Sequence, residues 1–300
     1  MSRRRLLIGG AATATAFATA AGGAAASNMA GDDVITVRHT FNVAQWPKGF
    51  SLSVGFLTDL HMGLRMNAMR LRGIVQAVNE MNCDVIGLGG DYLDSSPGGF
   101  FTDDVPAGDL GRELSSLASN TREVFGVPGN HDWRRHMDRI KTEFKRANIP
   151  LLQNQSVPIT KDGQRIWIAG LDSQWGPVGI EGVRDSRHDV AKTLQGIPAG
   201  EPVVMLMHEP DIFHKLPDNV HVALAGHTHG GQIYVPGIGR PLVALAPGRF
   251  APGLIYGPIS TLDQKRHMFI SAGVGCSGAP VRINVPPEIV KLTLKGIGPA

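Results

Sequence analysis

Residues 51–61 read Ser-Leu-Ser-Val-Gly-Phe-Leu-Thr-Asp-Leu-His, an alternating stretch that ends in an acidic and a basic side chain. The period of two over residues 51–57 predicts a β-strand with one buried face. Asp59 and His61 follow this strand, and residues separated by one position can point to the same side of an extended segment. The stretch therefore predicts a strand whose carboxyl end presents a carboxylate and an imidazole together.

The segments on either side of residues 51–61 have strand and helix patterns in turn. Residues 34–43 also have a period of two, and we expect them to pair with 51–57. Helical spacing predicts a helix over 66–81, and interleaved charges predict a solvent-facing helix over 133–147. Short apolar runs predict further strands at 83–88, 122–127, 165–171, 203–207, 222–225, 268–272 and 289–294. This succession is typical of an α/β fold with two sheets.

The composition limits the class of protein. Hydrophobic residues make up 42% of the 300 residues and charged residues 18%, which excludes a wholly disordered chain. The two cysteines, Cys83 and Cys276, exclude a disulfide-dense scaffold and a metal site built from four thiolates. They are either joined in one disulfide or free and buried. Nothing in the composition marks a second domain, so we expect residues 27–300 to form a single domain.

The N-terminal segment, residues 1–26, has the pattern of an export signal. Arg3, Arg4 and Arg5 precede two leucines, and a weakly apolar run without charge ends in three alanines. Paired arginines in this setting resemble the twin-arginine signal, which predicts the twin-arginine translocation machinery as a partner and a periplasmic location. An uncleaved signal that anchors the chain in the membrane is the alternative.

The three arginines of this segment also explain the basic charge of the chain. They belong to a total of 29 Lys and Arg residues, against 26 Asp and Glu residues, for a net charge of +3. Residues 27–300 therefore have a net charge of zero. A nucleic acid or another polyanion is not indicated as a partner.

Four more clusters of polar residues follow predicted strands, in addition to Asp59 and His61. They are Gly90-Asp91-Tyr92-Leu93-Asp94, Gly129-Asn130-His131-Asp132, His208-Glu209 and Gly226-His227-Thr228-His229. Ligands bind at the carboxyl ends of strands in open α/β sheets, so we expect these loops to meet at one edge. Carboxylate, amide and imidazole groups together suit Mn, Fe or Zn. Glycines directly before Asp91, Asn130 and His227 allow the sharp turns that such a site requires.

Each cluster by itself has an ordinary structural explanation. Asp94 and Asp132 suit turns or helix caps, and Asn130 suits a left-handed turn. His208 suits a hydrogen-bonded position in the core. Five such clusters in order, each after a strand, favour one shared metal site instead.

The five clusters together resemble the calcineurin-like metallophosphoesterase family, whose pattern is D-x-H, G-D-x-x-D, G-N-H-[DE], a lone His and G-H-x-H. Every motif is present between Asp59 and His229. Residues 273–275 and 284–289 are also similar to the branch of small exported bacterial phosphodiesterases. The resemblance implies a four-layer α/β/β/α sandwich with two mixed β-sheets.

The resemblance also implies two divalent metal ions and a role for each site residue. One ion would be held by Asp59, His61 and His229, and the other by Asn130, His208 and His227, with Asp91 bridging them. A bridging hydroxide would attack phosphorus in line, His131 would protonate the leaving oxygen and Asp94 would orient His131. Asp132 is expected to support the site without a chemical step.

One position departs from the family pattern. Serine/threonine protein phosphatases have an arginine after G-D-x-x-D, whereas this chain has Ser95. A guanidinium fork suits a monoester dianion, so its absence favours a phosphodiester or pyrophosphate substrate. The sequence therefore predicts a metal-dependent phosphodiesterase.

Two alternative functions remain open at this point. The first is an envelope hydrolase for a nucleotide-sugar or lipid-linked pyrophosphate, in which the apolar loop 235–258 covers a lipid chain near the membrane. The same loop can instead pack on the body of the protein. The second is a non-catalytic metal-binding surface protein, which the proton donor pair His131 and Asp94 disfavours.

Overall fold

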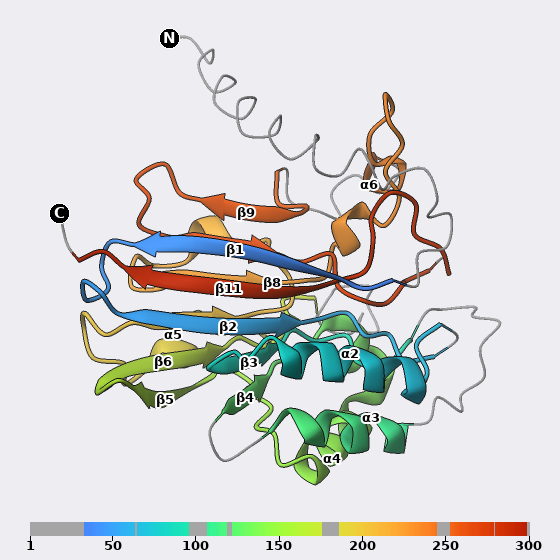
Figure 1. Ribbon diagram of the computed structural model, residues 1–300, viewed down its shortest axis with the longest axis horizontal. Coiled ribbons are helices and arrows are strands. Elements are labelled where there is room, and N and C mark those ends of the chain that lie inside the picture. Colours follow the sequence, from blue (N-terminus) through green and yellow to red (C-terminus); the bar gives the residue numbers. More distant parts are fainter. Residues whose placement is uncertain are drawn as a thin grey trace.

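Two mixed β-sheets form the centre of the computed structural model, which describes residues 33–63, 65–95, 107–118, 122–175, 186–244, 253–278 and 280–298. The first sheet has the order β1 (Ile35–Val43), β11 (Glu288–Gly296), β2 (Ser51–Leu57), β3 (Val85–Leu88) and β4 (Glu123–Gly126). The second has the order β5 (Gln155–Lys161), β6 (Gln164–Gly170), β7 (Val203–Leu206), β8 (Val222–Ala225), β10 (His267–Ile270) and β9 (Gly257–Ser260). Both sheets combine parallel and antiparallel pairs (Figure 1).

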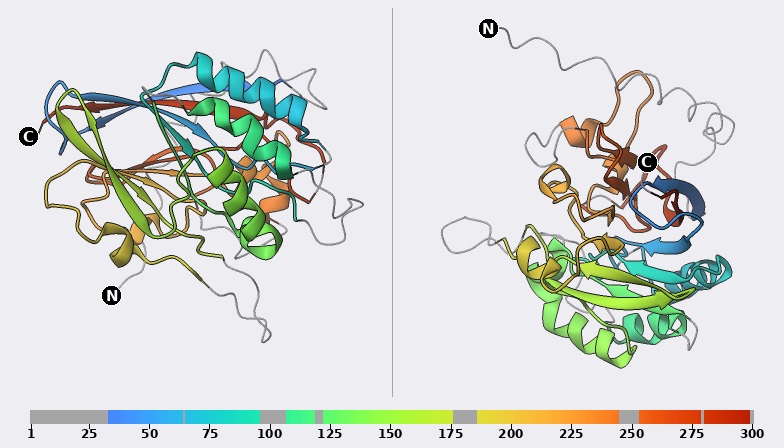
Figure 2. Two further views of the ribbon diagram at one scale, coloured as in Figure 1. Left: turned by 90° about the horizontal axis from the view of Figure 1, so that it is seen from below. Right: turned by 90° about the vertical axis from the view of Figure 1, so that its left-hand side faces the viewer.

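Helices cover the outer faces of the two sheets. The first sheet is covered by α2 (Ala68–Glu80), α3 (Ala107–Leu114) and α4 (Met137–Arg146), and the second by the short α5 (Val190–Leu194). Figure 2 shows α2–α4 and α5 on opposite sides of the paired sheets. Short turns η1 (Ser115–Leu117), η2 (Asp132–His136), η3 (Phe213–Lys215) and η4 (His229–Gly231) and the helix α6 (Pro241–Ala244) lie in the connections. The predicted α/β/β/α sandwich is confirmed.

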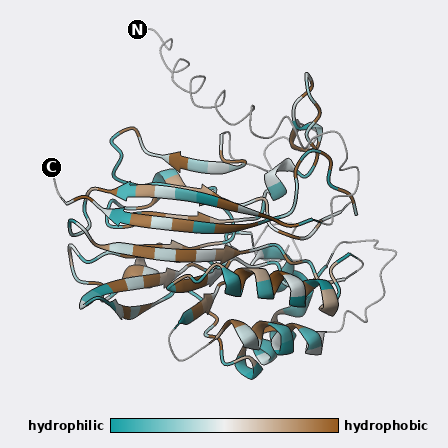
Figure 3. Ribbon diagram, in the orientation of Figure 1, coloured by the Kyte–Doolittle hydropathy of each residue, from teal (hydrophilic) through white to brown (hydrophobic). Residues whose placement is uncertain are grey.

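An apolar layer between the two sheets holds them together. It combines Phe56 and Leu292 of the first sheet with Ile168, Leu206 and Leu224 of the second, all of them buried. Alternating hydropathy along the strands is visible in Figure 3. Each fully buried aliphatic or aromatic side chain of this kind contributes about 1.5–3 kcal/mol to folding.

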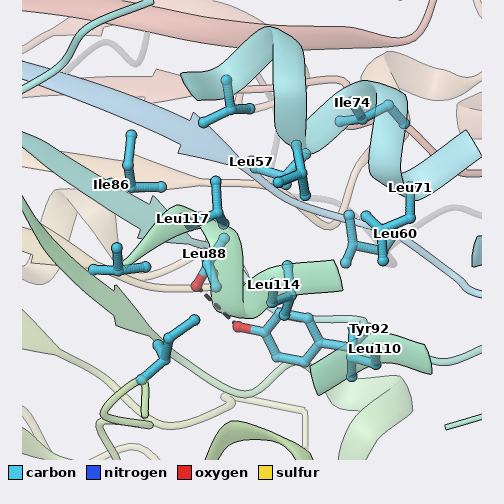
Figure 4. Close-up of a cluster of buried hydrophobic side chains, with 14 of the residues drawn as sticks. Leu57, Leu60, Leu71, Ile74, Ile86, Leu88, Tyr92, Leu110, Leu114 and Leu117 are labelled. Carbon is cyan, nitrogen blue, oxygen red and sulfur yellow. Dashed lines mark hydrogen bonds between the residues drawn. The ribbon is translucent and has the colours of Figure 1, made fainter. Parts of the chain in front are cut away.

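A second apolar layer packs the first sheet against its helices (Figure 4). Ile74 of α2 and Leu114 of α3 meet Leu57 and Leu88 of the strands there. Tyr92 lies in the same layer, and its hydroxyl is 3.1 Å from the carbonyl oxygen of Leu88. This buried hydroxyl is therefore satisfied by backbone, as burial requires.

The predicted pairing of residues 34–43 with 51–57 is wrong. Both segments are strands, but β11 lies between β1 and β2. Ile35 is aligned with Glu288 in a parallel pair, and Phe56 is aligned with Val290 in an antiparallel pair. Local periodicity predicts which residues face the core, but a partner from the far end of the chain is chosen by tertiary packing.

Several elements differ from the sequence prediction for identifiable reasons. The edge strand β5 was not expected, because Pro158 removes a donor from the ladder. The helix α3 was not expected, because Gly108 and Gly111 are poor helix formers. The helix predicted over 133–147 begins as the turn η2 and continues as α4, which buries Ile140 and Phe144 instead of facing solvent all round.

The predicted export signal, residues 1–26, lies outside the described residues, as do residues 245–252 of the predicted loop. Both Cys83 and Cys276 are free cysteines, and Cys83 is buried. Among the described residues, no helix combines the length and the apolar character needed to cross a bilayer.

A buried histidine directly before β8 of the second sheet provides a test of stability against pH. Burial lowers the pKa of His221 to about 4, and its Nδ1 accepts a hydrogen bond from the Val203 amide at 3.2 Å. The unfolded chain therefore binds a proton at this position between pH 6.5 and 4, and the folded chain does not. Stability is lost as the pH falls through this window, by about 1–2 kcal/mol between pH 7 and 5.

Replacement of His221 by Asn keeps an acceptor for the Val203 amide and removes the titration. We expect the unfolding free energy of His221→Asn to fall less than that of the wild type between pH 7 and 5. Urea unfolding at both pH values measures the difference. Equal losses of unfolding free energy in the two proteins would contradict the assignment of this pH dependence to His221.

Candidate metal centre

Six polar side chains of the predicted clusters are brought together at the carboxyl ends of four strands. Asp59 and His61 follow β2, Asp91 follows β3, His208 follows β7, and His227 and His229 follow β8. Because β2 and β3 belong to the first sheet and β7 and β8 to the second, the site lies at the edge that both sheets share. Asn130, which follows β4, joins them, with its Oδ1 2.9 Å from His227 Nδ1. The seven residues predicted as ligands thus lie at one place.

One group of potential ligands consists of Asp59, His61 and His229. One nitrogen or oxygen atom from each lies within 4.8 Å of those of the other two. The Nε2 atoms of His61 and His229 are 3.1 Å apart, and His229 Nε2 is 3.3 Å from Asp59 Oδ1. Among the described residues, the buried Nδ1 of His61 has no hydrogen-bond partner.

The second group consists of Asp91, His208 and His227, whose ligand atoms also lie within 4.8 Å of one another. Asp91 Oδ2 is 3.1 Å from His208 Nε2 and 3.4 Å from His61 Nε2 in the first group. A single carboxylate oxygen therefore lies between the two groups. This arrangement of oxygen and nitrogen donors without thiolate suits hard to borderline divalent cations.

The backbone at the ligands is strained. Asp59, His61, Asp91, His227 and His229 all have φ values between 42° and 70°. Non-glycine residues rarely adopt this left-handed region, and such strain collects at functional sites where the surrounding structure imposes it. The sequence shows the glycines of the motifs but not the strain at the ligands themselves.

Side chains behind the ligands hold them in place. Asp132 is fully buried, and its carboxylate accepts hydrogen bonds from the amides of Asp91, Tyr92 and Gly129 at 2.8–2.9 Å. It thereby joins the loop after β3 to the loop after β4. The predicted supporting role of Asp132 agrees with these contacts. His208 is fixed in the same way, because its Nδ1 lies 2.7 Å from the carbonyl oxygen of Gly89.

His131 lies beside the ligands, and both of its ring nitrogens lie near serine hydroxyls. Its Nδ1 is 2.9 Å from the Oγ of Ser95, and its Nε2 is 3.5 Å from the Oγ of Ser277. Asp94, which we expected to orient His131, has its Oδ1 4.0 Å from His61 Nδ1. It also belongs to a third potential ligand group with His61 and His131. Ser95 thus contacts Nδ1 of His131, and Asp94 lies close to the same ring.

Arg282 is a site residue that the sequence analysis missed. It is 6% exposed, its Nε and Nη2 donate to the carbonyl oxygens of Gly275 and Ala272, and its Nη2 is 3.3 Å from His229 Nδ1. The loop it holds also contacts the first ligand, since the amide of Gly275 donates to the carbonyl oxygen of Asp59 at 2.7 Å. Arg282 lies between residues 273–275 and 284–289, which are similar to the branch of small exported bacterial phosphodiesterases. This position in the sequence was the signal that could have pointed to Arg282.

Burial and mutual charge set the protonation of the site. Burial by itself would raise the pKa of Asp91, but His208, His131 and His61 hold that pKa well below its usual value. Burial lowers the pKa of His229 well below its usual value and that of His131 to about 3. Burial would lower the pKa of His208, but the Asp91 carboxylate raises it well above its usual value, so a cation that binds there must displace the His208 proton.

Comparison with known proteins supports the family that the sequence motifs resemble. A family model for calcineurin-like phosphoesterases matches residues 52–231. An uncharacterized metallophosphoesterase of Aquifex aeolicus is 24% identical over 277 residues, 87% of this chain and 92% of that protein. One of Campylobacter jejuni is 28% identical over 252 residues, 82% of this chain and 59% of that protein. The chain thus spans nearly all of the first relative and less than two thirds of the second.

Matches to solved structures are more distant. The phosphoesterase YfcE of Escherichia coli is 15% identical with a TM-score of 0.34, and the match covers 76% of this chain and 85% of that one. A 5'-nucleotidase precursor of Thermus thermophilus is 13% identical with a TM-score of 0.46, and the match covers 82% of this chain and 54% of that one.

The fold, the ligand groups and the family match together define a metal-dependent phosphoester hydrolase. The chain belongs to the calcineurin-like phosphoesterase family, whose model matches more than half of its length.

Gly129 provides a test of the packing behind the ligands. A Cβ at this position would overlap the Asp91 carboxylate and lie 2.7 Å from the Asp91 backbone nitrogen. We expect Gly129→Ala to displace Asp91 and weaken binding of divalent cations by about 10–100-fold. Calorimetric titration of the metal-free protein with Mn²⁺ measures this loss. The matched control is Gly73→Ala in α2, where no atom lies within 4 Å of the added Cβ; a similar loss there would contradict the explanation.

Metal binding should also stabilise the fold, because the ligands come from five strand ends. At a free metal concentration of a hundred times Kd, we expect the unfolding free energy to rise by about 2.7 kcal/mol. Asp91→Asn should remove most of this gain, whereas Asp138→Asn, an exposed change in α4, should leave it intact. Urea unfolding with Mn²⁺ and with a chelator measures the gain, and an equal gain in Asp91→Asn would exclude Asp91 as a ligand.

Proposed function

We propose that this phosphoester hydrolase is a phosphodiesterase. The observation that carries the proposal is the position of Ser95, where related phosphatases have an arginine. Ser95 is buried and occupied with His131 at 2.9 Å. Arg282, which contacts the ligand His229, donates to backbone carbonyl oxygens. A phosphate with one negative charge and two ester oxygens fits this site better than a monoester dianion.

The donor set fits two divalent cations of the Mn, Fe or Zn type. Asp59, His61 and His229 would hold one, and Asn130, His208 and His227 the other, with Asp91 shared between them. Bound there, two such ions lower the pKa of water and neutralise charge on phosphoryl oxygens.

His131 is the side chain that we assign to the leaving oxygen. Ser95 contacts its Nδ1 at 2.9 Å, whereas the contact of its Nε2 with the Ser277 hydroxyl is longer, at 3.5 Å, and can be replaced by a substrate. Burial keeps the free imidazole neutral, and a negatively charged phosphodiester beside it would favour its protonated form. The Asp94 carboxylate has an oxygen within 4.8 Å of a ring nitrogen of His131, and its negative charge also favours the protonated form of His131. His131 would then deliver the proton from Nε2 as the P–O bond breaks.

A nucleotide-sugar or lipid-linked pyrophosphate of the cell envelope is the second candidate substrate. It is favoured by the exposed apolar side chains Ile238 and Leu242 in the segment that follows His229. These residues have no role in a reaction with a small soluble diester. The non-catalytic alternative, a metal-binding surface protein, gives no role to His131.

We further propose that the protein works outside the cytoplasm and reaches its site through the twin-arginine machinery. The support is the sequence of residues 1–26, with three arginines before an uncharged run. Export in the folded state suits an enzyme whose ligands come from five separate strand ends.

An activity panel tests the proposed reaction. Metal-loaded wild-type protein should hydrolyse an aryl phosphodiester faster than the matching phosphomonoester. His131→Ala should lower kcat by about 10²–10⁴-fold while metal content is retained, because only proton delivery is lost. Asp91→Ala should lose both metal and activity.

His214→Ala, in the exposed turn η3, is the matched histidine control and should retain full activity. Faster turnover of the monoester would reject the phosphodiesterase assignment. Faster turnover of a pyrophosphate would select the second candidate. Equal turnover in wild type, His131→Ala and Asp91→Ala would end the proposal.

A further inference from the structure

Exposed apolar side chains gather in one region of the surface described by the structure. Five of the eight large apolar side chains that are exposed in the described residues belong to it: Ile35, Tyr234, Ile238, Leu242 and Tyr256. We call these five residues the apolar rim. Ile238 is the most exposed of them, at 75%. Soluble surfaces seldom collect such side chains without a partner.

Contacts within the apolar rim make it continuous. The guanidinium of Arg240 lies 5.4 Å from the ring of Tyr234 and 5.9 Å from that of Tyr256. The Tyr256 hydroxyl donates to Glu288 at 2.7 Å, and Glu288 is aligned with Ile35 at the start of β1. The rim therefore runs from residue 234 to the point where the N-terminal segment enters the fold.

The apolar rim borders the metal centre. Arg240 donates to the carbonyl oxygen of Gly230, the residue next to His229. A Cβ on Gly230 would lie 3.5 Å from the ring of Tyr256. Whatever covers the rim therefore lies beside the ligands.

The turn that carries Ile238 projects from the body of the protein. It is the orange loop above α6 in Figure 1, it also stands out in the right view of Figure 2, and apolar colour marks it in Figure 3. Its backbone bonds to itself, since the amides of Val235, Gly239 and Ile238 donate to carbonyl oxygens within the turn at 2.7–3.0 Å. Such a turn can enter an apolar medium with little loss of backbone hydrogen bonds.

We propose that the apolar rim docks on a lipid bilayer, with the turn Val235–Gly239 inserted among the lipid headgroups. Tyrosines around an arginine are typical of membrane interfaces, where rings and cation meet headgroups while aliphatic chains reach the acyl region. A projecting turn suits insertion into lipid, whereas a protein partner is normally met by a broader packed face.

The place where the described chain begins, together with the sequence before it, supports a bilayer as the partner. The described chain enters the fold at the rim, where the Ile35 amide donates to the Pro287 carbonyl oxygen at 2.9 Å. Of the residues before it, 6–26 carry no charge. Docking would hold the metal centre against the membrane surface, where phosphodiester headgroups are concentrated.

A tryptophan placed in the turn tests the insertion in the full chain. Ile238→Trp should show a blue shift of its added fluorescence with phosphatidylcholine–phosphatidylglycerol vesicles, and quenching when the lipids carry brominated acyl chains. The matched control is Leu262→Trp. Leu262 is fully exposed, and it lies between β9 and β10 at the end of the sheet away from the metal centre. It should show neither effect, even where residues 1–26 bind the vesicles. No shift at position 238, or equal shifts at both positions, would overturn the proposal.

A second comparison measures the contribution of the rim to binding. Ile238→Asp combined with Leu242→Asp should reduce the partition of the protein onto vesicles at least about tenfold, whereas Leu262→Asp should leave it unchanged. Turnover of a soluble aryl phosphodiester should be equal in all three proteins, which separates docking from the proposed reaction. Unchanged partition would reject the bilayer. Unchanged partition with a smaller oligomeric state in the double variant would assign the rim to a second copy of the chain.

Discussion

One buried carboxylate, Asp91, lies between the two ligand groups and determines how the surrounding loops must be built. Its Oδ2 is within 3.4 Å of imidazoles from both sheets, and its Oδ1 accepts the amide of His131 at 2.8 Å. A buried anion in this position requires nearby cations or polar hydrogens, or it would be protonated. The left-handed backbone at the ligands and the hydrogen bonds that the Asp132 carboxylate accepts both keep the Asp91 carboxylate in place.

The two-sheet architecture explains why such a costly centre is tolerated. Parallel strands of both sheets end at one edge, so the polar loops lie outside the apolar layer that joins the sheets. The core can then be wholly apolar, while strain and burial of charge are confined to the loops. Replacement of site residues can therefore alter the chemistry with little effect on the core.

The protein surface near the centre is as informative as the ligands. Arg282 and the loop it holds lie on one side of His229, and the apolar rim borders it through Gly230. The same few residues thus separate a buried polar centre from an exposed apolar surface. Proximity of these two features is a consequence of the turn η4, which carries His229 and leads directly into Tyr234.

Because its local motifs resemble those of the family, the sequence predicted the candidate ligands that the structure brings together. It also determined most strands, through apolar periodicity. The separation of β1 from β2 by β11, the contact of Ser95 with His131 and the contact of Arg282 with His229 appear only in the folded structure. These contacts join residues far apart in the chain or depend on side-chain direction. A local sequence pattern does not reveal long-range contacts or side-chain directions, because packing in the folded chain selects among partners that the pattern cannot distinguish.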